Sequence, residues 1–193
     1  MRALGLTMTM LAVLVWRGAV AAAEPVDARH RLSVEVDPVP YALHGYDAMV
    51  AYQHPALPRL RVLVSGYVTD LPPFGLSDGF AGRMRGAVLK ITYHARDGGR
   101  GWVTGGYASV TSTRYTHDDV DGMSETTSAL RFGPMVGYRW FPFRRGLFLY
   151  PWARLGLSLP VAGGREVEIG PERFEQSLVD VFATVHIGYE LPL

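Results

Sequence analysis

The chain has 193 residues, of which 48% are hydrophobic and 19% are charged, with 22 glycines, 13 prolines and no cysteine. This composition fits one folded domain, alone or behind a targeting segment, and excludes a disordered or collagen-like chain. The lack of cysteine excludes disulfides, thiolate zinc sites and thiol nucleophiles. A net charge of +1 gives no electrostatic basis for binding nucleic acid, which we therefore leave out of the expected partners.

The first 23 residues have the form of a secretory signal peptide. Arg2 opens the segment, an apolar stretch extends to Trp16, and small residues close it at 19–23. We predict cleavage after Ala23, which leaves residues 24–193 as a single mature domain. Loss of Arg2 and Arg17 leaves 17 basic against 18 acidic residues, a net charge near −1. An uncleaved anchor helix fits less well, because the apolar stretch is shorter than the ~20 residues of a membrane-spanning helix.

The rest of the sequence alternates apolar and polar residues between turn-forming segments. Successive side chains of a strand point to opposite faces, so this alternation predicts strands. Eight runs show it, over residues 31–37, 46–53, 60–69, 87–94, 102–113, 130–140, 147–158 and 178–191. Pro134 and Pro151 lie inside two runs, and because proline lacks a ladder N–H we expect them near strand ends or at bulges. Gly105 and Gly106 also predict a bend or a bulge.

The connectors between these runs alternate in length. Short connectors cover 54–58, 97–100 and 142–146, longer ones cover 71–83, 114–128 and 160–175, and the connector 38–44 is intermediate. Long and short connectors therefore fall at opposite ends of a meander, which is typical of membrane barrels with short periplasmic turns and longer external loops. The predicted fold is an all-β, eight-stranded antiparallel up-and-down transmembrane β-barrel.

The strand charges fall on one parity and the apolar side chains on the other. A soluble barrel would direct the apolar parity inward, whereas a lipid-embedded barrel directs it outward. Runs of roughly 10–13 residues favour the membrane, since a tilted crossing needs ~9–11. We therefore predict an outer-membrane location and a lumen lined by a polar network of near-balanced charge: Glu35, Asp47, Arg61, Lys90, Arg131, Arg139, Arg154, Asp180, His186 and Glu190.

Aromatic residues lie toward the ends of the predicted strands, as in the interfacial belts of membrane proteins. The predicted belt comprises Tyr46, Tyr52, Tyr93, Trp102, Tyr138, Trp140 and Tyr189. An eight-stranded barrel has an interior just wide enough for its own side chains, so we expect a filled lumen. Passive diffusion through the barrel is the weaker hypothesis.

On these patterns the sequence from about residue 31 to 193 resembles the small eight-stranded outer-membrane β-barrel proteins of bacteria. In that group the last strand alternates apolar residues and ends in an aromatic that the assembly machinery recognises. The alternation is present over 181–191, but the chain ends Leu191-Pro192-Leu193, so Tyr189 is the nearest aromatic. The resemblance implies the lipid bilayer, lipopolysaccharide and the assembly machinery as partners, and leaves the oligomeric state open.

Candidate chemistry is sparse. His186 and Glu190 share a face of the last strand, and some outer-membrane lipid hydrolases use a histidine with an acid and a serine. No His-x-Ser element accompanies them. The acidic segment 117–125 lacks the ligand spacing of an EF-hand, so we expect a solvated loop. We predict no metal, no cofactor and a non-enzymatic barrel whose loops contact lipid, ligands or cell surfaces. A lipid-modifying hydrolase using His186 and a soluble periplasmic barrel with a small apolar ligand are the alternatives.

Overall fold

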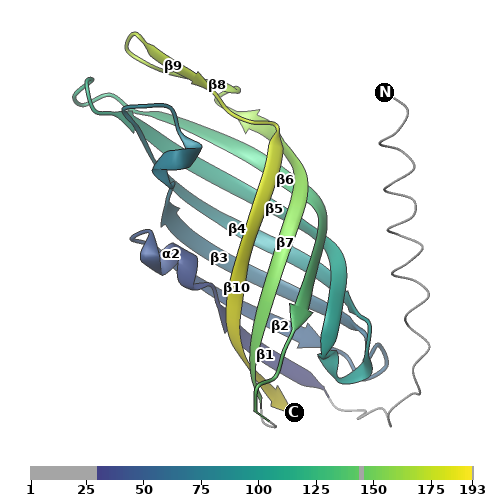
Figure 1. Cartoon of the computed structure of the whole chain (residues 1–193). Coiled ribbons are helices and arrows are strands. Elements are labelled where there is room, and N and C mark those ends of the chain that lie inside the picture. Colours follow the sequence, from purple (N-terminus) through teal and green to yellow (C-terminus); the bar gives the residue numbers. More distant parts are fainter. Residues whose placement is uncertain (1–29, 144–145, 193) are drawn as a thin grey trace, which may run out of the picture.

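The computed structural model describes residues 30–143 and 146–192, so the predicted signal peptide at 1–23 lies outside the described residues. Eight antiparallel strands pair around a closed ring in the order β1-β10-β7-β6-β5-β4-β3-β2 (Figure 1). Each strand pairs with its neighbours along the chain, and β1 closes the ring against β10. The predicted eight-stranded up-and-down barrel is thereby confirmed. The strands are β1 (Arg31–Val36), β2 (Tyr46–Gln53), β3 (Leu60–Asp70), β4 (Phe80–His94), β5 (Gly101–His117), β6 (Glu125–Arg139), β7 (Leu147–Ala162) and β10 (Val179–Pro192).

Connectors of different length lie at the two ends of the barrel. One end, the loop end, carries the helix α2 (Pro38–Ala42), the 3-10 turn η1 (Pro73–Gly75), the loop 118–124 and a hairpin of β8 (Glu166–Ile169) and β9 (Glu172–Glu175). The other end, the turn end, carries the short links, including η2 (Asp97–Gly99), and the two ends of the described chain. No helix within residues 30–143 and 146–192 is long and apolar enough to cross a membrane.

Several predicted strand bounds are wrong at the loop end. β4 begins at Phe80 rather than residue 87, β5 continues to His117, and β6 begins at Glu125. In the β4 extension the outer face carries Arg83 and Arg85 while Phe80 and Met84 point inward, which reverses the expected alternation, and in β5 and β6 the extensions are mostly polar on both faces. The predicted long loop 160–175 is also wrong, because it contains the end of β7 and the β8–β9 hairpin.

Pro134 lies in the interior of β6 and not at a strand end or bulge, contrary to the prediction. The pairing of β6 with β7 lapses between Phe132 and Met135, so the missing N–H of Pro134 falls in a gap of the ladder. The register shift in this pair lies instead at Ser128/Ala129. The ladder of β4 and β5 continues through Gly105, where a Cβ would lie 2.2 Å from the carbonyl oxygen of Ile91. Glycine there permits close strand approach rather than a bulge.

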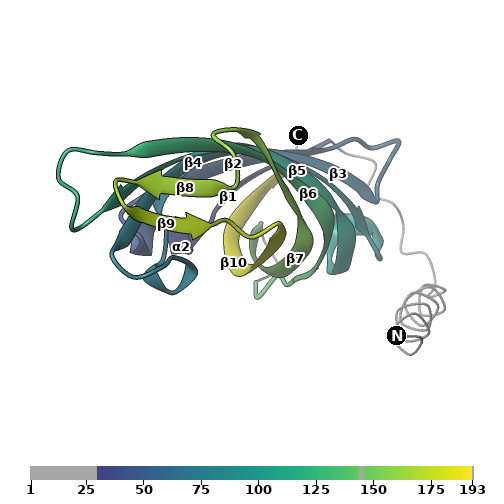
Figure 2. The same cartoon turned by 90° about the horizontal axis from the view of Figure 1, so that it is seen from above.

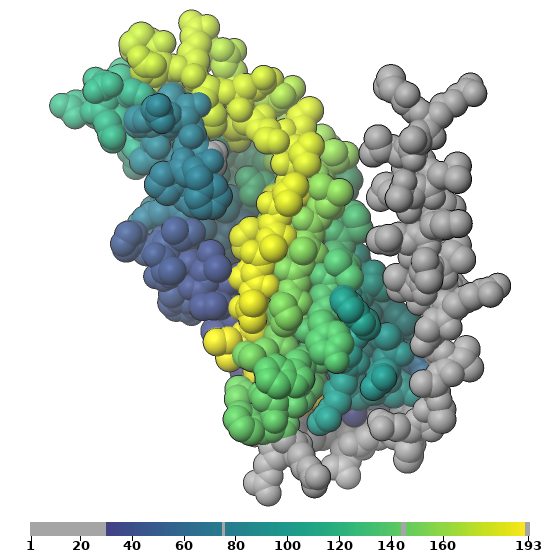
Figure 3. All heavy atoms as spheres, viewed as in Figure 1, coloured from purple at the N-terminus to yellow at the C-terminus, as the bar shows by residue number. Residues whose placement is uncertain are grey.

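The strands that form one side of the barrel wall are short. β1 and β2 have six and eight residues, because Pro38 and Pro40 end the first strand and open α2, whose N-cap Asp37 accepts a hydrogen bond from the Val39 amide at 2.9 Å. β10 pairs with β7 over Val179–Tyr189 but with β1 only from Ile187 onward. The surface is hollowed between β10 on one side and α2 and the η1 segment on the other (Figure 3).

Burial separates the two faces of the wall. Arg61 and Arg139, on the inner face, are 2% and 1% exposed, while Val64 and Val181, on the outer face, are 55% and 72% exposed. Apolar side chains also contribute to the interior, in a cluster centred on Phe148, Tyr150 and Trp152 of β7 with Val88, Val103, Tyr107 and Met135. Charge therefore faces inward and the outer face is mainly aliphatic.

The β8–β9 hairpin folds over the loop end rather than extending freely. It connects β7 to β10, yet its Val167 and Ile169 pack against Phe80 of β4 and Tyr115 of β5, whose inner faces lie across the ring. These four buried residues form a second hydrophobic cluster, which also takes in Leu71, Leu76, Val120 and Phe174. The hairpin lies across the strand ends (Figure 2) and, together with this cluster, forms a folded cap.

Candidate functional site

All ten residues of the predicted lumenal network lie on the inner face. Glu35, Asp47, Arg61, Lys90, Arg139 and His186 are buried, and Arg131, Arg154, Asp180 and Glu190 keep side-chain exposures of 9–17%. Eight of them fall into three groups stacked along the barrel axis. The groups are described from the turn end to the loop end.

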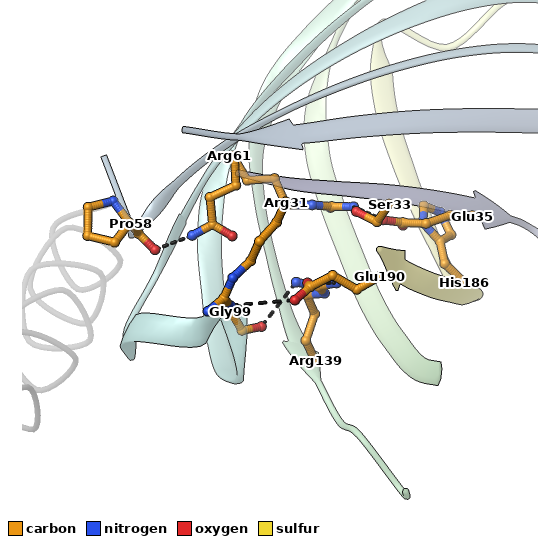
Figure 4. Close-up of polar contacts among 10 residues, drawn as sticks. Arg31, Ser33, Glu35, Pro58, Arg61, Gly99, Arg139, His186 and Glu190 are labelled. Carbon is orange, nitrogen blue, oxygen red and sulfur yellow. Dashed lines mark hydrogen bonds and ion pairs between the residues drawn. The ribbon is translucent and has the colours of Figure 1, made fainter. Parts of the chain in front are cut away.

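The first group closes the turn end around Arg139 of β6 (Figure 4). Its guanidinium pairs with Glu190 of β10 at 3.2 Å and donates to the carbonyl of Gly99, also at 3.2 Å. Arg31 of β1 lies 3.5 Å from the same Glu190 carboxylate. The guanidinium also stacks 3.8 Å above the ring of Phe148. Two arginines and one glutamate thus join β1, β6, β10 and the η2 turn inside the barrel.

The second group is a chain of hydrogen bonds at mid-height. Arg61 donates to Ser33 and to Glu35, whose other oxygen lies 2.9 Å from Nδ1 of His186. The indole N–H of Trp152 lies 2.6 Å from Nε2 of the same histidine. Because an indole nitrogen can only donate, Nε2 must accept, which assigns the ring proton to Nδ1 and makes it the donor to Glu35. Both ring nitrogens of His186 are therefore engaged.

The third group lies toward the loop end around Asp180 of β10. Its carboxylate accepts from the Tyr107 hydroxyl at 2.5 Å and pairs with Arg154 at 2.8 Å and Arg131 at 3.9 Å. The Arg154 guanidinium also lies 4.5 Å above the Tyr107 ring. Two cations and one phenol thus surround a single carboxylate.

Asp47 and Lys90 lie beside these groups. Asp47 accepts from the backbone amide of Asp37 at 2.8 Å, which ties β2 to the start of α2. Thr184 of β10 donates to the carboxylate of Asp37 at 2.7 Å. The Lys90 ammonium lies 3.6 Å over the ring of Trp152, a cation–π contact. Charged side chains from facing strands therefore meet across the interior.

The predicted aromatic belt divides between the two ends. Six members, Tyr52, Tyr93, Trp102, Tyr138, Trp140 and Tyr189, point outward near the turn end, and only Tyr46 lies at the loop end. Trp102 and Tyr138, on paired strands, stack edge-to-face with centroids 5.4 Å apart. Most of the predicted belt therefore lies at the turn end, while among the described residues Tyr41, Tyr46 and Phe74 are exposed aromatics at the loop end.

A contact outside the strands links two turns of that end. Arg59, between β2 and β3, donates to Asp97 of η2 at 2.7 Å. This hydrogen bond raises the pKa of Arg59 above its ordinary value, and a second hydrogen bond, to the Tyr93 hydroxyl, contributes less to the same change. The pair is more than a third exposed on the arginine side, so its contribution to stability is modest.

The geometry offers little to a hydrolase. A general base must reach its nucleophile, but the two ring nitrogens of His186 are already bonded to Trp152 and Glu35. The sequence does contain one Gly-x-Ser-x-Gly string, 75–79, with an exposed Ser77. It runs from the last residue of η1 to the residue before β4, whereas a nucleophile elbow lies between a strand and a helix. Within the described ranges no group of three His, Asp or Glu residues could hold a metal ion.

Sequence reasoning missed two sets of residues. Trp152 and Tyr107 are hydrogen-bonded members of the lumenal network; the shared parity of Trp152 with Arg154 could have indicated the first, whereas the two faces of the run that holds Tyr107 are hard to tell apart in the sequence. Arg83, Arg85 and Arg114 are charged residues on the outer face, where the alternation predicts apolar side chains. Their signal was hidden because the sequence pattern assigns no strand to residues 80–86 or beyond 113.

Comparisons with known proteins give weak likenesses. No protein-family model matches the chain, and no curated protein is significantly similar to it. Among solved structures, the N-terminal β-barrel domain of Pseudomonas aeruginosa OprF has 12% identity and a TM-score of 0.45, covering 83% of this chain and 97% of that one. Neisserial surface protein A has 10% identity and a TM-score of 0.45, with coverages of 88% and 100%. A major outer membrane protein from Thermus thermophilus has 15% identity and a TM-score of 0.45, with coverages of 84% and 99%. The barrel assignment follows from the strand pairing and not from these likenesses.

Proposed function

We propose that the protein is a non-enzymatic β-barrel of the bacterial outer membrane, whose filled barrel anchors a folded cap at the cell surface. The observation that carries this proposal is the inverted arrangement of the wall, with charges paired inside and aliphatic side chains outside. In water such an outer face would be an extensive exposed apolar surface. In hydrocarbon it is the expected surface of a barrel.

The dimensions of the wall support a bilayer crossing. β4, β5, β6, β7 and β10 have 14–17 residues, more than the ~9–11 of a tilted crossing. The surplus lies at the loop end, where the outer face of β4 and β5 becomes polar. The aromatic belt at the turn end marks the periplasmic interface, so the short turns face the periplasm and the cap faces outward.

The filled lumen supports an anchoring role. Side chains of facing strands meet across the interior in three ionic groups and one aromatic cluster. Since a small barrel encloses only its own side chains, this interior leaves the cap as the surface available to external molecules. The signal peptide of residues 1–23 delivers the chain to the periplasm, and the alternating apolar face of β10 is what the assembly machinery recognises. Lipid bilayer and lipopolysaccharide surround the inserted barrel.

The absence of cysteine permits a direct test. Met123→Cys, in the loop 118–124, and Leu57→Cys, in the short turn between β2 and β3, introduce thiols at sites of 52% and 54% exposure. A membrane-impermeant maleimide applied to intact cells is expected to label the first variant only, and both after lysis. Purified protein should also migrate faster on a denaturing gel before boiling than after it.

Other outcomes would contradict the proposal. Release of the protein by osmotic shock without detergent would indicate a soluble periplasmic barrel. Labelling of Leu57→Cys but not Met123→Cys in intact cells would reverse the orientation. A lipid hydrolase would instead be indicated if overexpression changed the acyl content of the cell's lipid A and His186→Ala abolished that change.

A further inference from the structure

Three arginines break the apolar pattern of the outer face at one place. Arg83 and Arg85 of β4 and Arg114 of β5 all point outward near the loop end. They lie on adjacent paired strands, with Arg83 directly opposite Arg114. We call these three residues the arginine cluster.

The cluster carries excess positive charge. Among the described residues, the one carboxylate paired with the cluster is that of Asp70 of β3, 3.4 Å from Arg83, and Asp70 lies equally close to His44. Within the described part of the chain, no carboxylate lies within 4.0 Å of Arg85 or Arg114. Like charges directly opposite each other destabilise a sheet. This contrasts with the lumen, where each arginine described above has an acidic partner, and it indicates that the cluster is balanced by a group from outside the chain.

The height of the cluster places it at a membrane interface. Arg85 and Arg83 lie eight and ten residues from Tyr93 of the aromatic belt, on the same face of β4. At about 3.4 Å per residue and a tilt of about 40°, these separations correspond to about 21 and 26 Å along the membrane normal. The apolar band of an outer-membrane barrel is ~25 Å tall. Between the two levels the outer face of β4 carries only Ala87, Leu89 and Ile91.

We propose that the arginine cluster binds the phosphate groups of lipid A, the phosphorylated glycolipid of the outer leaflet. The inference rests on the proposed outer-membrane location and adds to it a site and a lipid class. A guanidinium matches phosphate geometry with two parallel N–H donors, and three of them on neighbouring strands present a cationic surface to one headgroup. The acyl chains of that lipid then lie along the aliphatic outer face below the cluster.

The test uses folded, detergent-solubilised full-length protein titrated with fluorescent diphosphoryl lipid A. The variant R83Q/R85Q/R114Q removes the cluster. The matched control R100Q/R165Q/R173Q removes three other exposed arginines and so changes the net charge equally. An arginine near an anionic lipid surface contributes about fivefold to affinity, so the cluster variant is expected to bind on the order of a hundredfold more weakly. The control variant should bind like the parent protein.

Two further arms identify the ligand chemistry. Monophosphoryl lipid A should bind more weakly than the diphosphoryl form, and rising salt should reduce binding of the parent protein more than that of the cluster variant. Phosphatidylglycerol should compete poorly. Equal competition by phosphatidylglycerol would show a general preference for anionic lipids instead of recognition of lipid A. An equal loss of lipid A affinity in both triple variants would show that the arginine cluster is not the binding site. Surface labelling of Met123→Cys in the cluster-variant background separates these failures from failure of the outer-membrane location itself.

Discussion

The buried pair of Glu35 and Arg61 gives the sharpest test of how the barrel interior is stabilised. Their side chains are 0% and 2% exposed, and Glu35 also accepts from His186. Glu35→Gln preserves the shape but only one of the two acceptor oxygens that Glu35 uses, and it leaves the guanidinium without a counter-charge. Removing one partner of a buried pair costs about 3–5 kcal/mol, a factor of roughly 160–5000 in the unfolding equilibrium.

The two single substitutions should differ. A guanidinium stays charged in a protein, so Arg61 cannot escape its uncompensated state in Glu35→Gln. In Arg61→Met the remaining carboxylate keeps its hydrogen bond from His186 and can be neutralised by a proton. We therefore expect Glu35→Gln to be the more destabilising change. The double variant E35Q/R61M removes both charges and should lie within about 1 kcal/mol of the parent protein, because replacing a whole buried pair is often neutral.

Urea unfolding of the protein reconstituted in lipid vesicles measures these free energies, with the fluorescence of the outward-facing Trp102 and Trp140 reporting insertion. With an m value of about 2–3 kcal/mol/M, Glu35→Gln should lower the midpoint by about 1–2.5 M. Ser33→Ala, which removes a neutral acceptor from the same arginine, is the control and should cost only about 0.5–1.5 kcal/mol. A Glu35→Gln midpoint equal to that of Ser33→Ala, or a double variant as unstable as the single one, would refute the ion-pair account.

Two further predictions concern the outer face and the cap. Val185 points outward on β10, four residues from Tyr189, so Val185→Arg places a charge near the middle of the hydrocarbon and should lower the free energy of unfolding by about 2–4 kcal/mol. Val179→Arg, near the loop end, should cost about 0–1 kcal/mol. Equal costs in the same urea assay would contradict the assigned membrane position. Ile169 is 1% exposed, so Ile169→Asp should open the cap and increase protease cleavage within residues 163–178 on intact cells. The heat-modifiable mobility of the barrel should stay unchanged. An unaltered cleavage rate would show that the hairpin is not held by its apolar contacts.

The parity rule explains why much of the architecture could be predicted from the sequence. In a strand that separates two environments, every second side chain points to the same side. Charged residues such as Arg139 and Asp180 therefore identify the inward-facing positions before any contact is known. The strand number and the alternation of long and short links follow from the same runs. Partner choice does not follow, because Glu190 and Arg139 lie on strands separated in the ring by β7 and their meeting depends on strand tilt and on the narrow bore.

The rule fails where one environment gives way to another. Above the hydrocarbon the outer face contacts water or headgroups and the inner face packs under the cap, so Arg83 points outward, Phe80 points inward and the alternation expected of a membrane wall is lost although the strand continues. The cap was missed for a related reason. Its Val167 and Ile169 alternate for only four residues, and their burial depends on Phe80 and Tyr115, which are distant in the sequence.

Strand β4 alone displays the successive environments that the proposals require. Tyr93 begins the outer face at the turn end, Ile91, Leu89 and Ala87 continue it as an aliphatic stretch, and Arg85 and Arg83 end it. The inner face of the same strand follows a different sequence of environments, with Lys90 over Trp152 at mid-height and Phe80 under the cap. A soluble barrel has no reason to change its outer face twice along one strand. A bilayer supplies both changes, because it has two interfaces separated by about the length of that aliphatic stretch.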